Sequence, residues 1–141
     1  MIEVELFGEG LAPDSPPLDE VSRLCELSAR SRGVQSGHVA IEYVSSSRIA
    51  ELNQRHRAKP EPTDVLSFPI DGVESLDEDD ASDPGSEEPR ELGDIVICPR
   101  HTADLREAIV HGMLHLLGMD HETDDGEMLA LQDELLGEAG R

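Results

Sequence analysis

The sequence predicts an α+β protein in which helices pack on one small mixed β-sheet. Several short segments alternate apolar and polar residues, as half-buried strands do, and other segments repeat apolar residues at helical spacing. The two kinds of segment follow one another in the order strand, helix, strand, helix, strand, strand, helix, helix, which is typical of a mixed sheet with helices packed on it. The 141 residues have the length of one ordinary domain, so we expect a single domain over 1–141.

Four segments are expected to form the strands. Residues 1–7 (MIEVELF) and 38–44 (HVAIEYV) alternate apolar and polar side chains. Residues 64–70 (DVLSFPI) and 92–99 (LGDIVICP) are the other two. The strand over 64–70 should end near Pro69, because proline cannot donate a hydrogen bond to a neighbouring strand.

Four further segments are expected to form helices, namely 18–31, a stretch that begins near residue 46, 103–118 and 124–136. Each is bounded by residues that commonly cap or end a helix. In chain order these residues are Gly33 after the first helix, Ser45 or Ser46 before the second, Pro60 and Pro62 after it, Thr102 before the third and Thr123 before the last.

Charge is distributed unevenly along the chain. There are 32 acidic and 11 basic residues, a net charge of −21. Residues 71–91 hold ten of the acidic residues and one basic residue, and we expect a mobile surface loop there, between two strands. The overall charge argues against a protein that wraps a polyanion. A local basic patch is still possible, because four basic residues lie within 48–59: Arg48, Arg55, Arg57 and Lys59.

Composition restricts the location and the type of binding surface. The chain has no Trp, one Tyr and two Phe, which argues against nucleic-acid binding on stacked aromatic side chains. Cys25 and Cys98 lie among apolar neighbours and are expected to be buried thiols. No signal peptide pattern is present at the N-terminus, and no apolar run approaches the ~18 residues that span a bilayer. We therefore expect a cytoplasmic protein without a membrane partner.

The segment HGMLHLLGMDH, residues 111–121, points to a metal ion. His111 and His115 are four residues apart, so on a helix both imidazoles lie on one face and reach the same ion. Gly118 can adopt the positive φ that ends a helix, and the turn would return His121 toward them. Three histidines leave a fourth position for water, as in catalytic zinc sites. Such a water has its pKa lowered to about 7, which makes hydroxide available.

Other interpretations of these histidines stay open. They could be core or surface residues that bind no ion, or a structural zinc site completed by Asp120 or Glu122. Three imidazoles favour zinc, but nickel or copper would also bind. The remaining histidines lack this spacing and are expected to be structural or solvent-facing: His38, His56 and His101.

The same histidine spacing occurs in metzincin proteases, which read HExxHxxGxxH. In these enzymes the Glu after the first His is the general base. The chain has Gly112 at that position, and glycine has no side chain that could accept a proton. This difference argues against peptidase chemistry, although a metal-dependent amidase or protease remains the first alternative function.

Three sequence blocks resemble the YbeY family. HGMLHLLGMDH is similar to the family signature HGxLHLxGYDH, with Met119 at the position where tyrosine is common. Residues 53–69 (NQRHRAKPEPTDVLSFP) resemble the family block that ends in PTDVLSFP, with His56 at a usually aromatic position. Residues 92–97 (LGDIVI) match the family's strand. The chain departs from the family in two places, because the segment from Cys98 to His111 is short and the loop over 71–91 is long and acidic.

The resemblance implies both a fold and a function. The family has a compact α+β, zincin-like fold with one zinc ion per chain, held here by His111, His115 and His121. Its members are regarded as cytoplasmic endoribonucleases that act on single-stranded RNA, and no DNA is expected as a substrate. They take part in 3′-end maturation of small-subunit (16S) ribosomal RNA and in ribosome quality control, so the small subunit is an expected partner. A non-catalytic ribosome-assembly factor with a structural zinc ion is the second alternative.

We predict Arg57 and His115 as catalytic residues. Arg57 maps to the arginine that the family preserves strongly, and a planar guanidinium can contact two phosphoryl oxygens at once. It would then stabilise the charge that builds up during phosphodiester cleavage. Alternatively, Arg57 is a surface residue that interacts favourably with the end of its helix. Asp64 could orient a ligand histidine or Arg57, or it could cap a turn.

Overall fold

The computed structural model describes residues 2–57, 64–69, 91–119 and 126–139 of the chain. Within these ranges there are four strands and four α-helices, in the predicted order. The elements are β1 (Ile2–Phe7), α1 (Leu18–Ser31), β2 (Gly37–Tyr43), α2 (Ser46–Arg57), β3 (Val65–Pro69), β4 (Glu91–Ile97), α4 (Leu105–Leu116) and α5 (Glu127–Glu138). Two short 3₁₀ helices, Glu9–Leu11 and Pro99–His101, were not predicted and lie beside β1 and β4.

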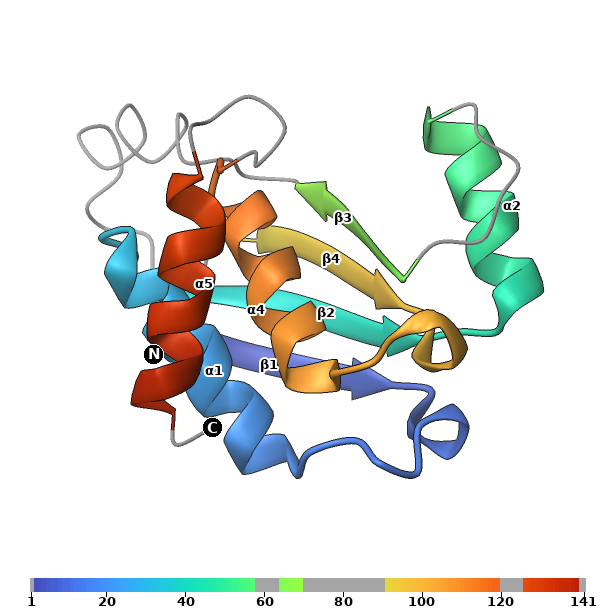
Figure 1. Ribbon diagram of the computed structural model, residues 1–141, viewed down its shortest axis with the longest axis horizontal. Coiled ribbons are helices and arrows are strands. Elements are labelled where there is room, and N and C mark those ends of the chain that lie inside the picture. The colour runs from blue at the N-terminus through green and yellow to red at the C-terminus, as the bar shows by residue number, and fades with distance from the viewer. Residues whose placement is uncertain (1, 58–63, 70–90, 120–125, 140–141) are drawn as a thin grey trace.

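The four strands form one mixed sheet in the order β1-β2-β4-β3 (Figure 1). β1, β2 and β4 are parallel, and β3 pairs antiparallel with β4 along the sheet edge. Pro69 is the last residue of β3, as predicted, and it lies opposite Gly93. The predicted α+β class with a small mixed sheet is therefore confirmed.

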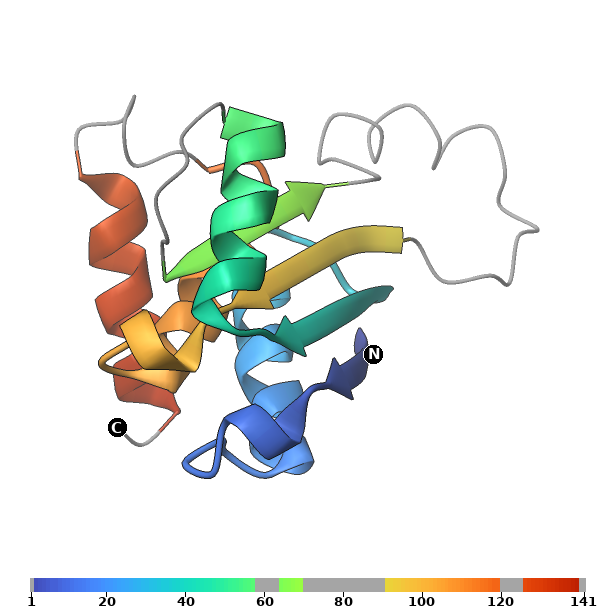
Figure 2. The same cartoon turned by 90° about the vertical axis from the view of Figure 1, so that its right-hand side faces the viewer.

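Three helices cover one face of the sheet, and the fourth stands apart. Figure 1 shows α1, α4 and α5 in front of the strands, and their apolar side chains share one core with β2 and β4, including Val39, Ile41 and Ile95. Helix α2 lies beyond the carboxyl ends of the parallel strands (Figure 2). A separate small apolar cluster holds it in place, made of Val44, Ile49, Leu66, Val96 and Cys98 with Leu52 and Phe68.

A bulge in β4 sets the register of the sheet edge. His38 of β2 pairs with Glu91 and Val39 pairs with Gly93, so Leu92 is the additional residue. Gly93 has a φ of +140°, and a Cβ atom there would lie 2.3 Å from the carbonyl oxygen of Phe68. Only glycine therefore allows β3 to approach β4 at this point.

The starts of the last two helices differ from the prediction. Helix α4 is capped by Asp104, whose carboxylate accepts hydrogen bonds from the amides of Arg106 and Glu107 at 3.0 and 3.3 Å. The predicted cap, Thr102, instead donates its hydroxyl to the carbonyl oxygen of Cys98 at 2.7 Å. A carboxylate satisfies two amides at once, and this explains why the helix begins at Leu105 rather than at residue 103.

Helix α5 begins at Glu127, later than predicted, because Gly126 precedes it with a φ of +102°. The predicted cap, Thr123, lies outside the described residues. Most of the expected acidic loop, 71–90, also lies outside them, whereas Glu91 is the first residue of β4 and not part of a loop.

The two cysteines are buried, as predicted. Burial raises the pKa of the Cys25 thiol to about 12, which keeps it protonated and unreactive. In the part of the chain that the structure describes, no helix has the length and apolar character needed to cross a membrane.

Candidate metal centre

Helix α4 carries two of the three histidines of the predicted site and is fixed against the sheet next to them. The chain packs closely at Gly112, where a Cβ atom would lie 2.6 Å from Cγ2 of Ile95. The hydroxyl of Ser67 in β3 donates to the carbonyl oxygen of Gly112 at 3.1 Å. With Gly112 turned toward the sheet, His111 and His115 lie on the more open side of the helix and are partly exposed.

The end of α4 has the turn that the sequence predicts. Gly118 adopts a φ of +96°, its amide donates to the carbonyl oxygen of His115 at 3.1 Å, and the amide of Met119 donates to that of Leu114 at 3.0 Å. This pair of hydrogen bonds is a Schellman motif, for which glycine is the preferred residue. The turn also directs the Met119 carbonyl oxygen toward Nδ1 of His115, 3.0 Å away.

The Nε2 atoms of His111 and His115 lie 3.2 Å apart, with the rings edge to face at 77°. Each Nδ1 atom has a carbonyl oxygen beside it. For His115 this is the backbone oxygen of Met119, and for His111 it is the side-chain Oε1 of Gln132, 2.8 Å away. A carbonyl oxygen only accepts hydrogen bonds, so each Nδ1 atom carries the ring proton. In the neutral rings, both Nε2 lone pairs are then directed toward the space between the two histidines.

This arrangement fits a zinc ion. Two imidazole nitrogens at ~2.05 Å from a tetrahedral ion are roughly 3.3 Å apart, close to the separation seen here. Neutral imidazole with its second nitrogen hydrogen-bonded is also the usual form of a ligand histidine. Among the described residues, no group of three or more metal-ligating side chains is present. His121, the predicted third ligand, lies outside them, so the full ligand set stays a prediction.

A cavity of about 310 Å³ opens beside His111. It lies between β3, the start of α4 and helix α5, and its lining includes His101, Leu129 and Gln132. Three carboxylates also line it, those of Asp64, Asp104 and Glu107. A cavity with this much negative charge attracts cations and repels phosphate groups unless a cation is bound.

The other residues predicted for the site are placed only in part. Arg57 is the last residue of α2, and its side chain lies outside the described part of the chain. Asp64 accepts the amide of Val65 with its carboxylate at 2.9 Å, and its carbonyl oxygen accepts the amide of Cys98 at 2.8 Å. Neither contact decides between the two roles expected of Asp64, which also lines the cavity.

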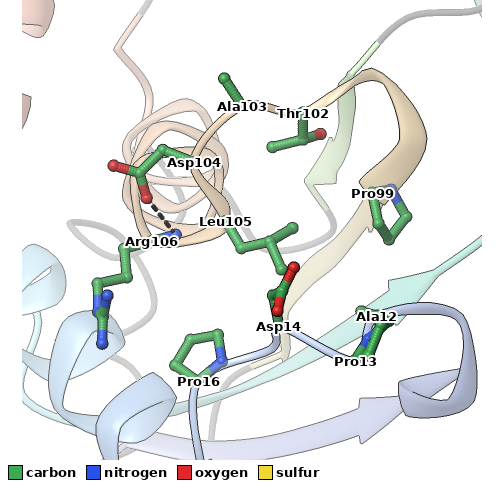
Figure 3. Close-up of a pocket in the computed structure, with 10 residues that line it drawn as sticks. All are labelled: Ala12, Pro13, Asp14, Pro16, Pro99, Thr102, Ala103, Asp104, Leu105 and Arg106. Carbon is green, nitrogen blue, oxygen red and sulfur yellow. Dashed lines mark hydrogen bonds between the residues drawn. The ribbon is translucent and has the colours of Figure 1, made fainter.

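A second cavity, of about 360 Å³, is lined by the segment that leads into α4 and by residues that precede α1, including Ala12, Asp14 and Pro16 (Figure 3). The two cavities share Thr102, Ala103 and Asp104. Arg106, a basic residue that lines the second cavity, points toward α1 and forms a salt bridge with Glu20. The hydrogen bond from Arg106 lowers the pKa of the Glu20 carboxyl group. Because this guanidinium is already paired, the histidine cavity is the better candidate for chemistry.

Gln132 is the site residue that the sequence analysis missed. It lies in α5, far from the histidine motif in the sequence, and is 5% exposed. Its neighbours on the buried face of α5 are Met128, Leu135 and Leu136. A polar residue on this otherwise apolar stripe is the signal that could have identified it.

Comparison with known proteins identifies relatives of the chain. The family model described as Endoribonuclease YbeY matches residues 18–140. Two proteins named Endoribonuclease YbeY are similar over nearly their whole length. The one from Macrococcus caseolyticus is 34% identical, covering 99% of this chain and 97% of its own. The one from Bacillus cytotoxicus is 33% identical, covering 97% and 96%.

The fold is also found in a solved structure. The solution structure of a protein from Thermotoga maritima aligns with a TM-score of 0.56 and 26% sequence identity, covering 96% of this chain and 88% of the other. The region that the family model matches contains both histidines of α4, helix α5 and every strand described here except β1. The chain therefore belongs to the Endoribonuclease YbeY family.

Proposed function

We propose that the protein is a zinc-dependent endoribonuclease that cleaves single-stranded RNA in the cytoplasm. We further propose that its substrate is the 3′ end of 16S ribosomal RNA and that it takes part in ribosome quality control. The observation that carries the proposal is the approach of the His111 and His115 Nε2 atoms to 3.2 Å, with both Nδ1 atoms beside carbonyl oxygens. Membership of a family whose members are named endoribonucleases supplies the reaction class.

His111, His115 and His121 would hold the ion. When bound at such a site, zinc lowers the pKa of a coordinated water to about 7 and polarises a phosphoryl oxygen. The chain itself supplies orientation. The Met119 carbonyl oxygen and the Gln132 amide fix the two rings of α4, and the contact between Gly112 and Ile95 fixes the helix on the sheet.

Arg57 is proposed to bind the phosphoryl group during cleavage. Two other arginines of α2, Arg48 and Arg55, already form salt bridges with Glu51, at 3.0 and 3.1 Å. The predicted basic patch is therefore partly neutralised by a residue of its own helix. Since the cavity beside His111 is lined by carboxylates, which repel phosphate groups, we expect weak RNA binding.

The environment of Gly112 gives no support to the protease alternative. In metzincins a glutamate occupies this position. Here the position faces Ile95 across a gap too narrow for a Cβ atom, so a longer side chain there would have to displace the helix from the sheet. A carboxylate introduced at residue 112 would be directed at the core rather than at the space between the histidines.

The test is cleavage of an end-labelled single-stranded RNA by purified protein, with and without a chelator. We expect cleavage that is lost in chelator and restored by zinc, with little cleavage of duplex RNA or of DNA of the same sequence. Zinc binding without cleavage of any RNA would contradict the nuclease proposal and favour a ribosome-assembly factor with a structural ion. Chelator-sensitive cleavage of a small amide substrate, in place of RNA, would favour the amidase alternative.

A further inference from the structure

Gln132 connects the last helix of the protein to the metal centre. Its side chain is 5% exposed, and its Oε1 atom lies 2.8 Å from Nδ1 of His111. The two residues are 21 positions apart and lie on different helices, α5 and α4, which pack on each other. Both also line the 310 Å³ cavity.

Burial of this amide has a cost that an apolar residue would avoid. Placing an amide in an apolar environment without a hydrogen-bond partner is unfavourable. The other buried residues of the same helix face are Met128, Leu135 and Leu136, and a similar side chain at position 132 would continue the core. The polar group at this position is therefore explained by its contact with His111 rather than by packing.

The two histidines are oriented in different ways. His115 is held by a backbone carbonyl oxygen that belongs to the turn after its own helix. His111 is contacted at Nδ1 by a side-chain oxygen from α5, Oε1 of Gln132. Both contacts have the same chemical effect, because an acceptor at Nδ1 places the ring proton there and leaves the Nε2 lone pair for a ligand bond.

We propose that Gln132 is a positioning residue of the metal centre, which accepts a hydrogen bond from the Nδ1–H group of His111 and holds the Nε2 atom of that ring toward the ion shared with His115. This inference rests on the proposed zinc site. It makes helix α5 part of the metal centre, although none of the predicted ligands belongs to it.

The test uses three variants. Gln132→Met keeps the length and volume of the side chain but removes the acceptor. Gln132→Glu keeps an acceptor at the same reach. Leu129→Ala is the matched control, because Leu129 lies on the same helix and lines the same cavity but is 47% exposed. A cooperative unfolding transition of each metal-free protein, monitored by circular dichroism, establishes that the variants are folded.

Zinc affinity is measured by competition with a chromophoric chelator, and the ligand geometry by the visible absorption of the Co²⁺-substituted proteins. We expect Gln132→Met to weaken zinc binding about 10–100-fold and to alter the Co²⁺ spectrum. Gln132→Glu should remain within a few-fold of the wild type, and Leu129→Ala should not differ from it. If Gln132→Met does not fold, Gln132→Asn, whose shorter side chain withdraws the oxygen from His111, should show the same loss.

Two results would contradict the inference in distinguishable ways. Wild-type zinc affinity and an unchanged Co²⁺ spectrum in folded Gln132→Met would show that Gln132 has only a packing role, while the metal centre itself would stand. A wild-type protein that binds no zinc in the same assay would instead overturn the proposed metal centre, and this inference with it.

Discussion

Nδ1 of His115 donates a hydrogen bond to the backbone carbonyl oxygen of Met119, at 3.0 Å. The acceptor is placed by Gly118, whose φ of +96° reverses the chain after α4. The turn therefore does more than end a helix, because it determines which nitrogen of His115 is available for a ligand.

Gly118→Ala is expected to weaken zinc binding as well as folding. A left-handed conformation costs a residue with a Cβ atom roughly 1–2 kcal/mol, and relief of this strain would move the Met119 carbonyl oxygen. Gly33→Ala is the control, since Gly33 also has a positive φ, +80°, but follows α1 and has no atom within 4 Å of the added Cβ. We expect similar losses of stability in urea unfolding and reduced zinc affinity in Gly118→Ala alone. Equal zinc affinities would contradict the role of the turn.

Arg57→Ala should lower the rate of RNA cleavage at least 10-fold and leave zinc content unchanged, because loss of a guanidinium from a phosphoryl group typically costs more than ~1.4 kcal/mol. Arg55→Ala is the matched control, as Arg55 belongs to the same helix and is already paired with Glu51 at 3.1 Å. Single-turnover cleavage assays with both variants test this. Equal rates in the two variants would remove Arg57 from the proposed site.

Gly112→Ala should destabilise the protein by about 1–3 kcal/mol, because the added Cβ would lie 2.6 Å from Cγ2 of Ile95 in a packed core. Gly137 lies in α5, and a Cβ atom added there would have no neighbour within 4 Å, so Gly137→Ala should be neutral or stabilising by up to ~1 kcal/mol. Urea unfolding of the metal-free proteins measures both, and an undiminished stability of Gly112→Ala would contradict the close packing of α4.

His38 makes the stability of the sheet depend on pH. Its ring lies between Glu5 of β1 and Glu91 of β4, with nitrogen–oxygen distances of 2.5 Å on each side. Burial lowers the pKa of His38, but the hydrogen bond to Glu5 and the charges of Glu91 and Glu5 outweigh it and raise the pKa overall. The protonated ring therefore stabilises the folded state fully below the unfolded pKa of ~6.5, and this stabilisation is lost as pH rises through the higher folded pKa.

The corresponding test compares wild-type protein with His38→Gln by urea unfolding at about pH 6 and pH 9. We expect the wild type to be more stable than the variant at the lower pH and to lose this advantage at the higher one. The difference should stay below ~1 kcal/mol, because both glutamates are about half exposed. A constant difference between the two proteins at both pH values would show that the ion pairs contribute nothing.

The sequence predicted most of the fold because its local signals agree with one another. The helix over Leu18–Ser31 has the predicted bounds, since its apolar spacing and its stop signal coincide. Prediction failed at the start of α4, for which only Thr102 was expected as the cap. Thr102 and Asp104 both precede α4, and the carboxylate caps the helix while the hydroxyl bonds to Cys98.

The site was predictable only where its residues are neighbours in sequence. The spacing of His111, His115 and Gly118 predicts both the shared helix face and the turn. Gln132 could not be paired with His111 in the same way, because the packing of α5 on α4 brings them together and no local period records that contact. The bulge at Leu92 also depends on two strands at once and left no pattern in either.

The most direct test of the metal centre is the zinc stoichiometry of the wild type and of His111→Ala, His115→Ala and His101→Ala, by elemental analysis after dialysis. His101 is the control, because it lines the same cavity but contacts the hydroxyl of Ser46 at 3.0 Å. We expect about one zinc ion per chain in the wild type and in His101→Ala, and far less in the other two variants. Full zinc content in both His111→Ala and His115→Ala would contradict it, because an ion held without these histidines cannot be the one that their Nε2 atoms are proposed to share.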